Sequence, residues 1–200
     1  GGGNVELDTT GGTVDVAAAS RVIGGGDGTT LAINASGAIT FNAGGDATEL
    51  SQAEFTANLT GATVMTEAGG TANFKTSGSS ANTITGAITT TNSKGTLVVA
   101  NTAGTTFTAG IGTDAAKLLA ATVNASSVAE FQGAIAADTL TITGTATLGA
   151  ATNESEVFAM GASSVLYIDN TITNGQTVIS EVATTRPTLT SGAKIYIPEN

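Results

Sequence analysis

Hydrophobic and polar residues alternate along most of the chain, in short runs of about four to seven residues. Val5 and Leu7 alternate with polar residues at one end, and Leu31 and Ile33 do so in residues 30–35. A period of two places successive side chains on opposite faces of a β-strand. The pattern therefore predicts one all-β domain over residues 1–200. The same pattern recurs in residues 14–16, 39–41, 97–99, 140–142, 165–168, 178–179 and 195–197.

Helical signals are sparse. Residues 48–55 and 114–121 are the two windows where one or two helical turns are expected, with Asp114 as a helix N-cap in the second. Elsewhere Thr and Gly dominate the chain, and both residue types are poor helix formers.

A short internal echo favours one all-β architecture. Gly-Ala followed by a large aliphatic residue recurs at Ile39, Ile88 and Ile135, at separations of 49 and 47 residues. Two turns of about 24 residues each account for this spacing, and fixed periods of this size are typical of stacked repeats. We therefore expect a right-handed β-helix, or β-solenoid, with about 24 residues per coil. The alternative fold is a β-sandwich of the S-layer or pilin type.

Composition fits a narrow, stacked interior and excludes several chemistries. The chain has 27 Gly and only 4% aromatic residues, so inward positions are small or aliphatic. It has no His and no Cys. Relays of the Ser-His-Asp or Cys-His kind, disulfide frameworks and zinc ribbons are therefore excluded. We expect no enzyme and no cofactor.

Net charge narrows the possible partners. Six Lys and Arg residues stand against 16 Asp and Glu residues, which gives a net charge of −10. Nucleic acid and anionic lipid repel such a chain, so neither is an expected partner. No apolar run approaches the length of a membrane span, and no targeting segment is visible. We expect these residues to be a slice or a processed subunit of a larger chain.

Four segments carry a resemblance to a known family. They are residues 112–118 (GTDAAKL), 123–125 (VNA), 129–135 (AEFQGAI) and 137–142 (ADTLTI). Over residues 104–150 the chain resembles passenger regions of bacterial autotransporters, notably rickettsial-type outer-membrane surface proteins, and elsewhere it resembles them only in style. The resemblance implies a β-helical stalk on the cell surface, without the membrane barrel of that family.

Two groups of acidic residues are candidates for chemistry. Asp27 and Asp46 follow glycine runs that match fragments of the calcium-binding nonapeptide, so Ca²⁺ at these residues is the alternative to glycine-rich corners. Glu154 and Glu156 lie on one face if the segment is extended, as a pair of catalytic carboxylates requires. We interpret both as solvated surface residues.

The ends of the chain are the candidate assembly interface. Val5 and Leu7 at one end, and Ile195, Tyr196 and Ile197 at the other, form apolar strands with no capping element. We expect head-to-tail strand addition to another copy or to flanking sequence. The strand context of Tyr167 and Tyr196 predicts partial burial, and an exposed aromatic at a lateral or end-on interface is the alternative.

The combined expectation is a non-enzymatic structural protein of the bacterial cell exterior. It would serve as a surface stalk, a coat or a self-assembling extracellular filament, with adhesion among the roles open to it. The alternative function is a β-helical protein that binds or depolymerises polysaccharide.

Overall fold

The structure is a computed structural model. It describes residues 5–9, 14–17, 19–23, 30–35, 39–43, 50–55, 58–60, 62–67, 71–91, 93–172, 178–180 and 187–197. Within these residues the secondary-structure elements are all β-strands, and neighbouring strands within each sheet are parallel. No described segment forms a helix of the length and apolar character needed to cross a membrane. The all-β prediction is therefore confirmed for the part of the chain that is described.

Three sheets run side by side along the molecule. Sheet 1 contains β1 (Val5–Thr9), β4 (Thr30–Ala35), β7 (Asn58–Thr60), β10 (Asn82–Ile84), β13 (Thr105–Phe107), β15 (Val128–Phe131), β17 (Thr145–Leu148), β19 (Val165–Ile168) and β22 (Lys194–Tyr196). Sheet 2 contains β2 (Val14–Ala17), β5 (Ile39–Ala43), β8 (Thr63–Glu67) and β11 (Ile88–Thr90). Sheet 3 contains β3 (Ala19–Ile23), β6 (Leu50–Phe55), β9 (Thr71–Thr76), β12 (Lys94–Val99), β14 (Leu118–Val123), β16 (Ala136–Ile142), β18 (Asn153–Met160) and β20 (Ile179–Ser180), with β21 (Thr188–Leu189) also paired to β18.

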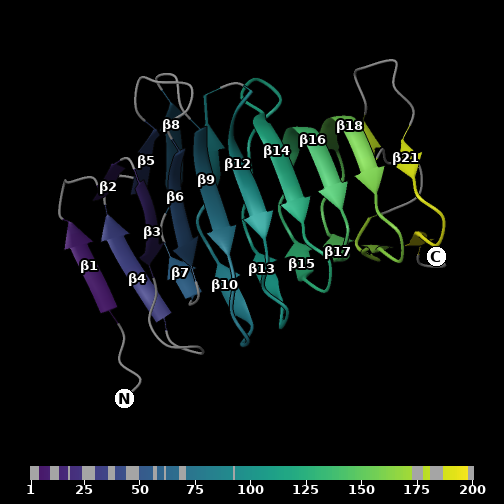
Figure 1. Cartoon of the computed structure of the whole chain (residues 1–200), viewed down its shortest axis with the longest axis horizontal. Coiled ribbons are helices and arrows are strands. Elements are labelled where there is room, and N and C mark those ends of the chain that lie inside the picture. Colours follow the sequence, from purple (N-terminus) through teal and green to yellow (C-terminus); the bar gives the residue numbers. More distant parts are fainter. Residues whose placement is uncertain are drawn as a thin grey trace.

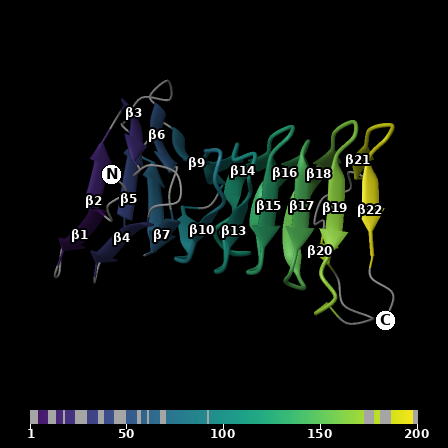
Figure 2. The ribbon, with the colours of Figure 1, turned by 90° about the horizontal axis from the view of Figure 1, so that it is seen from below.

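The strands of each sheet follow the order of the chain. Figures 1 and 2 show an elongated molecule, with β1 at one end and β22 at the other. Each strand of sheet 1 pairs with the previous and the next strand of that sheet, so the two edges of sheet 1 are β1 and β22. The backbone hydrogen bonds between strands therefore run along the long axis of the molecule.

The separation between paired residues varies along sheet 1. It is 26 residues from Val5 to Leu31, 24 from Thr105 to Ala129, 17 from Ala129 to Ala146, and 29 from Leu166 to Ile195. The predicted spacing of about 24 residues thus matches the middle of the sheet. The separation shortens where the chain passes directly from sheet 1 to sheet 3 without a strand of sheet 2 between them, as between β15 and β16.

The Gly-Ala echo corresponds to one column of paired residues. Ile39 pairs with Thr63, and Thr63 pairs with Ile88. Beyond the end of sheet 2 the column continues as isolated bridges, from Ile88 to Ile111 and from Ile111 to Ile135. The three echo residues therefore lie two pairings apart, as their spacing predicts.

The core lies between the sheets and follows the alternation of the sequence. Along β12, the side chains of Leu97 and Val99 are buried, and the residues between them are partly exposed. Aromatic rings stack from strand to strand at two places. The centroids of Phe107 and Phe131 are 5.2 Å apart, and those of Phe55 and Phe74 are 4.6 Å apart. Such pairs add about 0.5–1.5 kcal/mol each beyond their buried area.

Both windows expected to hold helical turns are wrong. Residues 50–55 form β6, and residues 118–123 form β14, which pairs with β12 on one side and β16 on the other. Asp114 lies in a tight turn, in which Thr113 and Ala116 exchange backbone hydrogen bonds of 3.1 and 3.0 Å. Pairing to two neighbouring strands overrides the local helix propensity of Ala, Leu and Lys.

A buried polar corner joins sheet 3 to sheet 1 between β12 and β13. Asn101 is fully buried there, and its side-chain amide makes contacts on both ends. Its Nδ2 donates to the Ser80 carbonyl (2.9 Å), Asn82 Oδ1 (3.0 Å) and the Gly104 carbonyl (3.0 Å), and its Oδ1 accepts from the Ala103 N–H (2.9 Å). Because buried polar groups are costly when unpaired, this network fixes the path of the corner.

Candidate functional site

The predicted site residues fall in different parts of the molecule. Asp27 and Asp46, the candidate calcium ligands, lie outside the described residues. Val5 and Leu7 lie on the edge strand β1, where their backbones pair with Leu31 and Ile33. Among the described residues, no three acidic, His or Cys side chains gather in a way that would hold a metal ion.

The other predicted assembly residues lie at the opposite end, on and after β22. A tight turn sets the start of this strand: the Ala193 N–H donates to the Thr190 carbonyl at 3.0 Å, and Gly192 has a φ of +91°. Glycine adopts this left-handed conformation without steric cost. The Lys194 N–H then bonds the Ser164 carbonyl at 3.0 Å, which places Ile195 beside Leu166.

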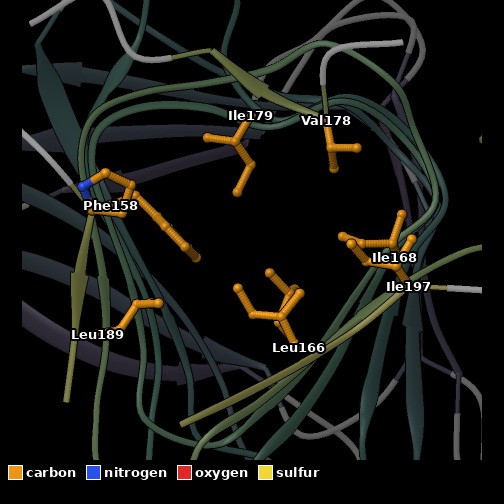
Figure 3. A pocket seen from close by; sticks show the side chains of 9 residues that line it. Phe158, Leu166, Ile168, Val178, Ile179, Leu189 and Ile197 are labelled. Atoms are coloured by element: carbon orange, nitrogen blue, oxygen red, sulfur yellow. The ribbon is translucent and has the colours of Figure 1, made fainter. Parts of the chain in front are cut away.

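An open apolar cavity of about 390 Å³ lies beside β22. The final separation of 29 residues, from Leu166 to Ile195, is longer than the 20 residues from Ala146 to Leu166, so the last layer is wider than the layer beneath it. Figure 3 shows the labelled side chains arranged around the space that results. The lining residues are Phe158, Leu166, Ile168, Val178, Ile179, Pro187, Leu189, Ile195 and Ile197.

Several lining residues of this cavity are exposed to solvent. The exposed fraction is 74% for Ile197 and 53% for Leu189. β22 pairs with β19 on one side, and within the described residues no strand pairs with its other side. An apolar end next to an unpaired strand edge is a typical site for strand addition.

The sequence predicts part of this site. Ile195 and Ile197 both line the cavity, whereas Tyr196 lies on the outer face of sheet 1, where its ring stacks on that of Tyr167. The two tyrosines are 43% and 47% exposed, so they match the exposed alternative better than burial. Sequence reasoning missed Pro187 and Leu189, because β21 is too short for its alternation to be visible.

A charged cluster lies away from the cavity, where β14 and β18 approach. The Lys117 ammonium is buried, with Nζ 3.9 Å from Asp114 Oδ1 and 3.9 Å from Glu154 Oε2. Glu154 is only 18% exposed, and no described group donates a hydrogen bond to its Oε2. The interpretation of Glu154 as solvated is therefore wrong, whereas Glu156 is exposed as expected. A ladder partner at Ala136 draws Glu154 toward sheet 3.

The pKa of the Glu154 carboxyl is raised above its ordinary value of 4.5. Burial is the main cause, and the hydrogen bond and negative charge of Asp114 act in the same direction, while Lys117 opposes them. A raised folded-state pKa means that the folded protein favours the protonated acid. Its stabilising contribution is present below the unfolded pKa and is lost as the pH rises through the folded pKa.

We therefore expect Glu154→Gln, which cannot ionise, to gain stability relative to the parent protein as the pH rises from 4 to 7. Urea denaturation at several pH values measures this difference in the free energy of unfolding. Glu156→Gln, on the exposed neighbour, is the matched control and should stay within about 0.5 kcal/mol of the parent. A loss of stability in Glu154→Gln that grows toward pH 7 would show that the Lys117 ion pair outweighs burial.

Comparisons with protein-family models, with curated proteins and with solved structures found no match. Functional argument therefore starts from the geometry of the stack and of its open end.

Proposed function

We propose that the chain is a segment of a right-handed parallel β-solenoid that serves as a structural, non-enzymatic protein of the bacterial cell exterior. The observation that carries this proposal is the unbroken order of sheet 1, in which nine parallel strands pair in chain order from β1 to β22. Right-handed connection is the rule for parallel strands joined by crossovers. A passenger of the autotransporter type, acting as stalk, coat or filament, has this kind of architecture.

Composition supports a durable scaffold. Six Lys and Arg residues offer few sites to trypsin-like proteases, and the absence of Cys leaves no thiol to oxidise. The buried Phe stacks and the Asn101 corner give successive layers specific contacts. In such a stack each layer contacts chiefly its neighbours, so length can grow without a larger core.

We further propose that the open end beyond β22 receives β1 of a second copy as a parallel strand. The strands carry complementary charge, because β22 contains Lys194 whereas β1 contains Glu6 and Asp8. The end layers also match in length: the first separation, from Val5 to Leu31, is 26 residues, and the last is 29. Contact of this head-to-tail kind produces open filaments unless the rotation closes.

Ile197→Lys is expected to abolish end-to-end association, because it places a charge in the apolar end while removing an exposed side chain. Sedimentation velocity over a range of protein concentrations measures the effect. Leu119→Lys is the matched control, since Leu119 is also exposed, at 44%, but lies on the middle strand β14 of sheet 3. It should associate like the parent protein.

Two results would overturn the assembly proposal. One is a parent protein that stays monomeric at high concentration, and the other is an equal effect of Ile197→Lys and Leu119→Lys. Circular dichroism of each variant establishes that a loss of association does not reflect unfolding.

Polysaccharide binding is the second candidate function, and a polar groove of about 280 Å³ on the outer face of sheet 1 favours it. Glu130 accepts hydrogen bonds there from Thr106 (3.1 Å) and Gln132 (2.9 Å). Asp169 accepts from the Thr171 N–H at 2.8 Å, and this bond lowers the pKa of Asp169. Retardation in gels that contain a neutral polysaccharide would support binding, and release of reducing ends would indicate depolymerisation.

A further inference from the structure

The chain has only two tyrosines, and the fold brings them into contact. Tyr167 on β19 and Tyr196 on β22 are 29 positions apart in the sequence and are paired in register. Their ring centroids are 5.0 Å apart, with 15° between the ring planes. Both rings lie on the outer face of sheet 1, where 43% and 47% of the two residues is exposed. An oxidant in solution can therefore reach both phenols.

No other accessible side chain in this chain competes well for a one-electron oxidant. The sequence contains no Trp and no Cys. Its two methionines, Met65 and Met160, are buried in the core, with at most 1% exposure. The stacked tyrosines are thus the most readily oxidised exposed groups. Because the two rings are held together, coupling between them is far faster than an encounter between separate molecules.

We propose that Tyr167 and Tyr196 are an oxidative cross-linking site, at which a carbon–carbon bond forms between ring carbons ortho to the two hydroxyls. The oxidant is a haem peroxidase with hydrogen peroxide. Each phenol gives one hydrogen atom to the peroxidase, and the two phenoxyl radicals couple through their ortho carbons. The hydrogens on those carbons then move to the two oxygens, which restores both phenols. The protein loses two hydrogen atoms, and one peroxide becomes two waters.

The cross-link would fasten the last layer of the stack. β22 has three residues and pairs with β19 alone among the described strands. A covalent bond between Tyr167 and Tyr196 closes the long loop from β19 to β22 and limits its freedom in the unfolded state. This proposal rests on the tyrosine stack and does not depend on association between copies.

The test is oxidation of dilute protein with a haem peroxidase and hydrogen peroxide, followed by mass spectrometry. The intact mass should fall by two hydrogen atoms, with the blue fluorescence of coupled phenols. After trypsin, the peptide of residues 195–200 should be joined to the peptide that contains Tyr167. Tyr167→Phe and Tyr196→Phe should each remove the product, and the yield per chain should not depend on protein concentration.

Two further variants separate proximity from mere reactivity. Thr147 pairs with Tyr167 on the side away from Tyr196, so Thr147→Tyr in the Tyr196→Phe background should restore the cross-link. Thr106 is three pairings from Tyr167 in the same column, so Thr106→Tyr in that background should not. Products that link only separate chains, or no product while free N-acetyltyrosine couples in the same solution, would overturn the proposal.

Discussion

Gly133→Ala is expected to destabilise the folded protein by about 4 kcal/mol, one of the largest effects of any single methyl group in the chain. A Cβ at Gly133 would lie 2.3 Å from the Ala109 carbonyl carbon, and 2.5 Å from both the Ala109 oxygen and the Gly110 nitrogen. All three are backbone atoms of the adjacent layer. They cannot move without loss of the hydrogen bond from the Ile111 N–H to the Ala134 carbonyl, 2.9 Å long. Urea denaturation measures the change.

Gly110→Ala is the matched control, because Gly110 occupies the equivalent corner one layer earlier. A Cβ there would meet the Ala134 oxygen at 3.6 Å, which is an ordinary van der Waals contact. We expect a change below about 1 kcal/mol, the scale of a Gly-to-Ala exchange at an unstrained position. Equal losses in the two variants would show that the layers do not pack as closely as the structure has them.

These two glycines also illustrate how far the sequence predicts the fold. The recurrence of Gly-Ala-Ile at Ile88 and Ile135 predicts a column two layers long, and the pairings through Ile111 have that form. The sequence does not reveal which of two glycines in the same column touches backbone. That distinction depends on how closely two corners approach, and no local pattern encodes it.

The layer length is another feature that the sequence gives only on average. The separation of 17 residues from Ala129 to Ala146 arises because β16 follows the Ile135 bridge directly, with no strand of sheet 2 between. Alternation marks the strands in this region but does not assign them to sheets. The wide final layer, and therefore the apolar cavity beside β22, was equally invisible in the pattern.

Long-range contacts between polar residues were the least predictable part of the candidate sites. The Tyr167 and Tyr196 stack needs a separation of 29 residues, which a constant spacing of about 24 would not produce. Likewise, Lys117 meets Glu154 through the register of β14, β16 and β18, although the two residues are 37 positions apart. Nothing near either residue in the sequence indicates its partner.

Asn101→Ala is expected to destabilise the protein by about 3 kcal/mol, because it removes one side chain from a corner of fully buried polar groups. The Asn101 amide is the partner of the Ala103 N–H at 2.9 Å and of the Gly104 carbonyl at 3.0 Å. Alanine would break both bonds and leave a small cavity in which no side-chain amide replaces them.

Thr102→Ala is the control for this corner, since the exposed Thr102 hydroxyl makes only a long, 3.5 Å contact with the Gly78 carbonyl. We expect it to change the free energy of unfolding by less than about 0.5 kcal/mol, as is usual for surface residues. Hydrogen exchange adds a local measurement: in Asn101→Ala the amides of Ala103 and Thr105 should exchange faster, while those of the distant strand β17 keep pace with global unfolding. If both variants are equally stable, water or backbone rearrangement satisfies the corner, and the Asn101 network does not fix the passage from sheet 3 to sheet 1.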